Sequence, residues 1–361
     1  MKVFKKIAVL LLVAVMSLSV TGCLHKKDEI AVTINDMEFT SAYYMCALIN
    51  ANMEARGLVD EALTEDEKLA EVDYTSKKVE GKKFVDWVED KAIESIKKIA
   101  AYKLLCKENK IELDEEKLAS VENYITYVWS GYVQNITHED FEQNGVSQDT
   151  FRAFTTDMIY GESYFEFLYG KEGKKAIADK DIKSKMNENF QIGNILEANI
   201  DASAATNGTD IKKTLEGYAA DLKAGKKTFE QVYVEYNKEE NHSHEETEDG
   251  PKDPHAQIIG AEDTNYSSPY YYEQLKSMKV GEVKVINTES GTGFVLLVKQ
   301  DINVDPYYLK TLDSDVRHII ADDEFDKSIA DYAKKLKIDI DDYAIGQFDV
   351  EDIKKSQAIA Y

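Results

Sequence analysis

The spacing of apolar residues changes near Gly193, and this change constrains the fold more than any other feature of the sequence. From Phe84 onward, apolar residues recur every three or four positions, which predicts amphipathic helices. After Gly193, short apolar runs at 194–200, 283–286 and 294–298 are bounded by polar turns, which predicts strands. We therefore expect a helical region followed by a small α/β region.

The expected helices have recognisable boundaries. Asp114 and Ser147 each precede an apolar stripe and can cap the first turn of a helix. The stripes predict helices at 84–109, 114–132, 147–169, 176–190 and 314–336. A brief strand at 30–34 is expected before them, and residues 60–83 are charged and expected to be irregular.

The composition limits the class of protein. The chain has 361 residues, 43% of them hydrophobic, which is ample for packed cores and excludes global disorder. The net charge of −24 disfavours nucleic acids and anionic membrane surfaces. No basic patch with interleaved aromatic residues is present. We therefore expect two or three soluble, packed domains that bind no nucleic acid.

The first residues predict export. Lys2, Lys5 and Lys6 precede an apolar run at 7–16 that is too short to span a bilayer as a helix. Small residues then lead into Cys23, and this segment resembles the bacterial lipobox, in which the cysteine is lipidated. The alternative is an ordinary signal peptide followed by an incidental cysteine. Lipidation of Cys23 would anchor the chain to a membrane surface.

Two cysteines remain after the leader. Cys106 continues a helical apolar stripe, so we expect it to be buried. The sequence leaves open whether Cys46 and Cys106 form a disulfide.

Two stretches resemble the SurA/PrsA-type foldases. Residues 30–48 (IAVTINDMEFTSAYYMCAL), with the helices to Gly170, resemble their N-terminal domain. Residues 192–301 resemble a parvulin-type peptidyl-prolyl isomerase domain, notably in 194–196 (NIL), 222–230 and 278–283 (MKVGEV). The resemblance implies an α+β protein whose helical domain is completed by a C-terminal helix, with the parvulin-like domain inserted.

The parvulin pattern is broken at both histidine positions. Asn194 replaces the histidine of the first strand, and Gly293 or Val295 replaces the histidine of the closing strand, depending on a gap. The resemblance implies that these histidines support catalysis of prolyl isomerisation, whose barrier is about 18–20 kcal/mol. No confident catalytic residue remains, and whether the domain is an enzyme stays open.

Aromatic residues suggest a retained binding groove. The positions where the family places its groove-lining residues are Tyr266, Tyr270, Tyr271, Tyr272, Met278 and Phe294. Such side chains bind extended proline-containing segments well. The alternative is that several of them cover the core of the small domain.

A histidine cluster lies between the two halves of the α/β region. His242, His244 and His255 are surrounded by carboxylates and are weak candidates for Zn²⁺, Ni²⁺ or Cu²⁺. A solvated loop at 237–256 is the favoured interpretation, so we expect no metal and no cofactor.

These observations define the expected organisation. We expect a lipoprotein signal peptide (1–22), a tether (23–29), a helical chaperone-like domain (30–190), a parvulin-like domain (191–304) and a C-terminal helix and tail (305–361). The expected function is that of a membrane-tethered extracytoplasmic chaperone or foldase whose partners are unfolded or nascent exported polypeptides. An active isomerase with an altered site and a ligand- or partner-binding lipoprotein are the alternatives. The sequence leaves the oligomeric state open.

Overall fold

The computed structural model describes residues 29–64, 67, 72–131, 137–199, 208–239, 244 and 250–353. The predicted leader, the tether up to residue 28 and the lipidation site Cys23 lie outside these residues. The chain is an α+β protein that divides into two compact units. Unit 1 combines Met1–Phe167 with Phe325–Tyr361, and unit 2 is Leu168–Glu324.

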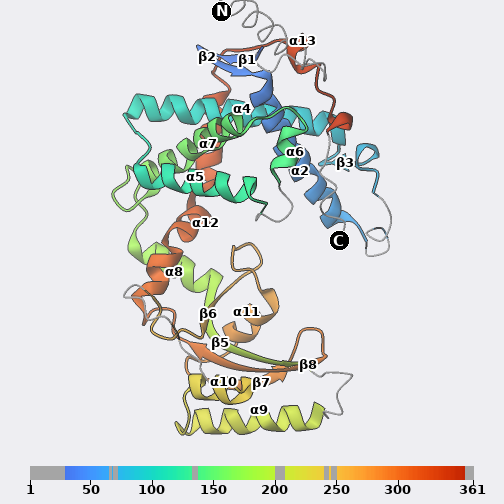
Figure 1. Ribbon diagram of the computed structural model, residues 1–361. Helices are drawn as coiled ribbons and strands as arrows, with labels where there is room; N and C mark the ends of the chain where they lie inside the picture. The colour runs from blue at the N-terminus through green and yellow to red at the C-terminus, as the bar shows by residue number, and fades with distance from the viewer. Residues whose placement is uncertain are drawn as a thin grey trace, which may run out of the picture. The chain divides into compact units, whose positions relative to one another are not determined.

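Unit 1 is mainly helical and is closed by a small antiparallel sheet (Figure 1). The sheet has the order β2-β1-β9, and its third strand comes from the end of the chain. Its strands are β1 (Ile30–Ile34), β2 (Met37–Thr40) and β9 (Ile338–Ile340). Its longer helices are α2 (Ser41–Ala62), α4 (Phe84–Asn109), α5 (Glu115–Trp129) and α7 (Gln148–Tyr169), which ends just beyond the unit. The shorter elements are β3 (Lys78–Val79), β4 (Lys82–Lys83), α6 (His138–Glu142) and α13 (Asp342–Ile345).

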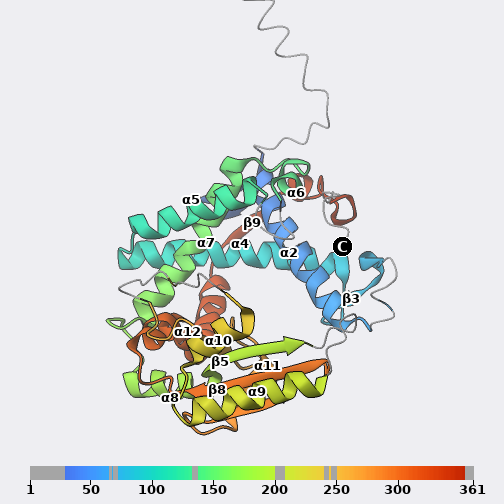
Figure 2. The same ribbon diagram turned by 60° about the horizontal axis from the view of Figure 1, so that its bottom comes forward.

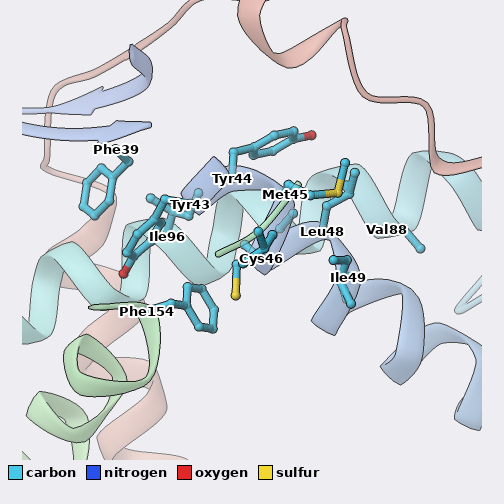
Figure 3. Packing of buried hydrophobic residues seen from close by; sticks show 14 of the residues in the cluster. Phe39, Tyr43, Tyr44, Met45, Cys46, Leu48, Ile49, Val88, Ile96 and Phe154 are labelled. Atoms are coloured by element: carbon cyan, nitrogen blue, oxygen red, sulfur yellow. The ribbon is translucent and has the colours of Figure 1, made fainter. Parts of the chain in front are cut away.

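The core of unit 1 forms around the nearly all-buried first half of α2 (Figure 3). The ring of Tyr43 lies 5.2 Å from the ring of Phe154, and its hydroxyl donates to Asp157. Cys46 and Cys106 are both buried and both free. Burial raises the pKa of the Cys106 thiol to about 11, so neither packing nor acidity indicates a reactive cysteine.

Unit 2 is built on a four-stranded antiparallel sheet with the order β6-β5-β8-β7. The strands are β5 (Phe190–Asn199), β6 (Ala256–Gly260), β7 (Val283–Asn287) and β8 (Gly293–Gln300). Helices α9 (Gly208–Lys223) and α10 (Phe229–Asn237) cover one face, and α11 (Pro269–Lys276) covers the other (Figures 1 and 2). Each face therefore has its own small core.

A third core joins the ends of the sheet to two flanking helices. Helix α8 (Asp179–Asn189) runs directly into β5, and α12 (Pro306–Ala333) follows β8 after a short turn. Buried residues from α8, β5, α12 and the turn between β8 and α12 form one cluster: Ile182, Met186, Phe190, Ile192, Ile302, Tyr308, Leu312 and Val316. The buried guanidinium of Arg317 donates to the Tyr169 carbonyl (2.7 Å) and to both oxygens of Asp313. The apolar cluster therefore holds the start of β5 and the turn after β8 against α8 and α12.

The helices agree with the apolar periodicity more closely than the other elements do. Helices α4, α5, α7 and α8 fall within a few residues of the expected ranges. Asp114 caps α5 by accepting from the Lys117 amide (2.8 Å). Helix α12 begins at Pro306, eight residues before the expected start, and β9 follows it. The expected domain limits at 190 and 305 remain predictions beside the observed division after Phe167 and Glu324.

Candidate functional site

The degenerate catalytic positions lie on opposite faces of the sheet. Asn194 pairs with Val298, whereas Val295 pairs with Glu197. Because alternate residues of a strand project to opposite faces, Asn194 lies on the side of α9 and α10, and Val295 on the side of α11. Gly293 pairs with Asn199 and shares the face of Val295. The structure therefore does not bring Asn194 together with either candidate for the second position.

Asn194 belongs to a buried polar network. Its amide nitrogen donates to Asp253 (2.9 Å), and its amide oxygen accepts from Gln300 (2.6 Å). The backbone N–H of His255 donates to the other oxygen of Asp253 (3.0 Å). Asn194 is fully buried, so these contacts satisfy a side chain whose desolvation would otherwise be costly. The network attaches the segment before β6 to the centre of the sheet.

Gly193, which precedes Asn194 and lies on the α11 face of β5, has no space beside it for a side chain. A Cβ atom on Gly193 would lie 2.8 and 2.9 Å from the two methyl groups of Leu275 and 3.1 Å from the Val298 carbonyl oxygen. These distances are shorter than van der Waals contact, so the glycine permits helix α11 to approach the sheet. No side chain larger than hydrogen fits here without displacement of Leu275.

A cavity of about 590 Å³ opens beside β5 and β6. Its volume is within the range of small-ligand sites. Two strands (β5 and β6), two helices (α10 and α11) and one loop contribute to its wall. The lining residues are Ile195, Leu196, Glu197, Tyr233, Asn237, Gln257, Ile258, Ile259, Asn265, Tyr266, Ser267, Ser268 and Tyr271.

One wall of the cavity is a strand edge. Strand β6 pairs with β5 only from Phe190 to Asn194. Strand β8 pairs with β5 on the other side as far as Asn199. Within the described residues, no strand pairs with 195–199 on the β6 side. Such an edge presents backbone donors and acceptors to an incoming chain.

A tyrosine and a carboxylate meet at the cavity wall. The hydroxyl of Tyr271 on α11 donates to the carboxylate of Glu197 on β5. Burial and this hydrogen bond raise the pKa of the Tyr271 hydroxyl above its ordinary value, because both disfavour the phenolate. The Tyr271 hydroxyl therefore stays a neutral hydrogen-bond donor at physiological pH.

The aromatic residues singled out from the sequence lie in different environments. Tyr266 and Tyr271 line the cavity. The hydroxyl of Tyr270 donates to the Asn287 carbonyl (2.7 Å). Tyr272 and Met278 are buried in the core beneath α11, and Phe294 packs on the opposite face, with α9. Only two of the six thus contribute to the cavity.

Sequence reasoning missed the polar part of this wall. Glu197, Asn265, Ser267 and Ser268 line the cavity, yet none carries a motif. The alternation of β5 contained a usable signal, because an exposed glutamate between buried Leu196 and Ala198 marks the open face.

The structure brings two of the three predicted histidines together. His244 and His255 lie against each other and against Glu230 of α10. His242 lies outside the described residues. Glu230 carried no signal of this role in the sequence, because it is 14 residues away from His244 along the chain.

Comparisons with known proteins give structural matches alone. No family model matches the sequence, and no curated protein does. The chain is similar to the foldase protein PrsA from Lactococcus lactis, with 11% identity, 88% of this chain and 96% of that chain covered, and a TM-score of 0.39. PrsA from Streptococcus pneumoniae matches with 14% identity, 67% and 82% coverage and a TM-score of 0.37. These matches belong to the group of foldases that the sequence resembles, but similarity at this level assigns no activity.

Helix lengths and hydropathy bear on membrane insertion. Among the described residues, no helix is both long and apolar enough to cross a bilayer.

Proposed function

We propose that this protein is an extracytoplasmic chaperone that binds extended segments of unfolded exported polypeptides. The observation that supports the proposal best is the cavity in which the open edge of β5 lies beside Tyr266 and Tyr271. The proposal agrees with the sequence resemblance to SurA/PrsA-type foldases.

The chemistry of the cavity suits an extended chain. An added strand forms main-chain hydrogen bonds with an open edge whatever its sequence, and neighbouring pockets accept alternate side chains. Tyrosine rings bury a large apolar area with few rotors to immobilise. Ser267, Ser268 and Asn265 add polar groups that can pair with peptide amides. This combination favours broad over sequence-specific recognition.

Membrane tethering at Cys23 forms the second part of the proposal. Two or three acyl chains would hold the protein stably at the outer face of the membrane. Tethering raises the effective concentration of emerging chains without new contacts. Cys23→Ser is expected to release the protein from membranes while leaving peptide affinity unchanged. Full activity of the released protein in cells would contradict the role of the anchor.

Peptide binding is tested with the purified protein and an unfolded client. Tyr271→Ala is expected to weaken binding of a fluorescent extended peptide at least tenfold and to reduce suppression of client aggregation. Tyr343→Ala is the matched control, because Tyr343 in unit 1 is 70% exposed and should have no effect. Equal affinities of both variants and the parent would refute the cavity as the client site.

Isomerase activity is the alternative that a proline-switch assay decides. Asn194 and Val295 cannot act on one substrate bond from opposite faces. Turnover in the parent that Tyr271→Ala abolishes would establish an altered catalytic site. If neither turnover nor client binding is measurable, the ligand- or partner-binding lipoprotein becomes the leading function.

A further inference from the structure

We infer that Glu230, His244 and His255 form a zinc site that fastens the segment before β6 to helix α10. Each of the three side chains offers one ligand atom, and all three atoms lie within 4.8 Å of one another. His244 Nε2 lies 3.1 Å from His255 Nε2 and 3.2 Å from Glu230 Oε2. His255 Nε2 lies 2.5 Å from the same Glu230 oxygen.

These separations approach those of metal ligands. Zinc bonds of about 2.0–2.1 Å in a tetrahedral arrangement place the ligand atoms about 3.3 Å apart. The two separations that involve His244 are within 0.2 Å of this value, and the third is shorter. A cation at the centre therefore needs only a small outward movement of His255 or Glu230.

Hydrogen bonds alone explain the positions of the His244 and His255 rings less well than a bound cation does. If both Nε2 atoms donate to the Glu230 oxygen, two N–H groups face each other across 3.1 Å. If one Nε2 is unprotonated, it can accept from the other Nε2–H across 3.1 Å, but its lone pair then lies close to the Glu230 oxygen as well, and two acceptors repel each other. A divalent cation accepts both nitrogen lone pairs and the carboxylate charge together, which removes both conflicts.

The surroundings hold the ligands in place. The side chain of His255 is 7% exposed, and its ring lies 4.3 Å from the ring of Tyr233 and 5.8 Å from that of Phe229. Its backbone N–H donates to Asp253, which also accepts from Asn194. Glu230 is in the first turn of α10, a helix capped by Thr228. Two of the three ligands are therefore positioned by independent structure.

The donor set indicates the metal. Two imidazoles and one carboxylate form the ligand set of catalytic and exchangeable zinc sites, which keep a fourth position for water. The side chains of His244 and Glu230 are 30% and 42% exposed, so water can reach that position. The net charge of −24 raises the local concentration of cations. Cu²⁺ and Ni²⁺ can bind the same donors, so the experiment compares them.

Calorimetric titration of the purified protein with ZnCl₂ tests the site. We expect one zinc ion per chain, and at least tenfold weaker binding in Glu230→Gln and in His244→Ala. Both variants change partly exposed side chains, so they should fold. His318→Ala is the matched control, because His318 lies outside the proposed site and pairs with Asp322 on the same helix (2.7 Å). This control should bind zinc as the parent does.

Cobalt substitution gives a second readout. Co²⁺ in the parent should show the strong visible absorption of a four-coordinate site, and Glu230→Gln should lose it. Zinc should also raise the Tm of the parent, but not that of Glu230→Gln, because a ligand that binds the folded state stabilises it. Saturable binding of Ni²⁺ or Cu²⁺ with no measurable binding of Zn²⁺ would overturn the assignment of zinc, whereas tighter binding of Cu²⁺ is expected of any site with these donors. No saturable binding, or binding that survives both Glu230→Gln and His244→Ala, would overturn the site.

Discussion

Asn194 and Val295 project from opposite faces of one antiparallel sheet, with Asn194 opposite Val298 and Val295 opposite Glu197. A pair of side chains can serve one catalytic centre only from the same face. Histidine at both positions would therefore place one imidazole toward α10 and the other toward α11. The separation depends on strand register, which substitution of single side chains does not alter.

Asn194→Ala is expected to destabilise unit 2. The change leaves Asp253 and Gln300 without their shared partner, and an unsatisfied buried polar group costs about 1–3 kcal/mol. Chemical denaturation measures the loss. In a double-mutant cycle, Asp253→Ala should cost less in the Asn194→Ala background than in the parent. Additive losses would show that the network is not coupled.

Gly193→Ala should lower the free energy of unfolding by about 1–3 kcal/mol, because the added methyl group overlaps Leu275. Gly217→Ala in α9 is the matched control, since a Cβ atom there meets nothing within 4 Å. Alanine in an open helical position should stabilise by up to about 1 kcal/mol. The two variants should thus shift the thermal midpoint in opposite directions, and shifts of the same sign would contradict the proposed close approach of α11.

Lys299 is expected to make stability depend on pH. Burial lowers the pKa of Lys299 from 10.5 to about 8. Between these values the unfolded chain binds more protons than the folded one, so the free energy of unfolding rises with pH across this window. One pKa unit corresponds to about 1.36 kcal/mol. Relative to the parent, Lys299→Met should lose about 1–3 kcal/mol of stability between pH 7 and pH 10. A pH-independent difference between the two proteins would exclude this titration.

Arg317→Met should destabilise the protein by about 1.5–3 kcal/mol, the range for hydrogen bonds to charged groups. The buried guanidinium donates to Asp313 and to the Tyr169 carbonyl at the end of α7. Arg317→Lys should recover only part of the loss, because an ammonium group cannot form both contacts in a fixed plane. Arg152→Met serves as the control: its ion pairs with Glu122 and Asp149 are at the surface and should be worth less than about 1 kcal/mol. Equal losses in the two methionine variants would contradict the structural role of Arg317.

The helices could be predicted from the sequence because their caps and apolar stripes lie within the helix itself or next to it. Asp114 and the stripe that follows it place α5 within a residue of its observed start. The same reasoning could not place β9, which pairs with β1 across about three hundred positions, because such contacts leave no periodic signal in either segment. Helix α11 was also missed, since Tyr270, Tyr271 and Tyr272 are consecutive and show no helical spacing.

The candidate sites also depend on contacts between distant parts of the chain, which local sequence does not predict. Tyr266 and Tyr271 could be chosen from the sequence, but the burial of Tyr272 follows from the direction of α11, which no local pattern gives. The meeting of Glu230 with His255 depends on how α10 lies against the start of β6. Residue type could suggest the histidine ligands, whereas only the fold shows that Glu230 lies beside them.

Ile192, near the start of β5, and Gln300, at the end of β8, are direct partners across these two strands. Everything between them forms a cassette whose two ends lie side by side. A gene could lose, replace or duplicate such a cassette in one step, since a short linker would rejoin α8 to α12. The cassette and the helices that flank it can thereby change independently in evolution.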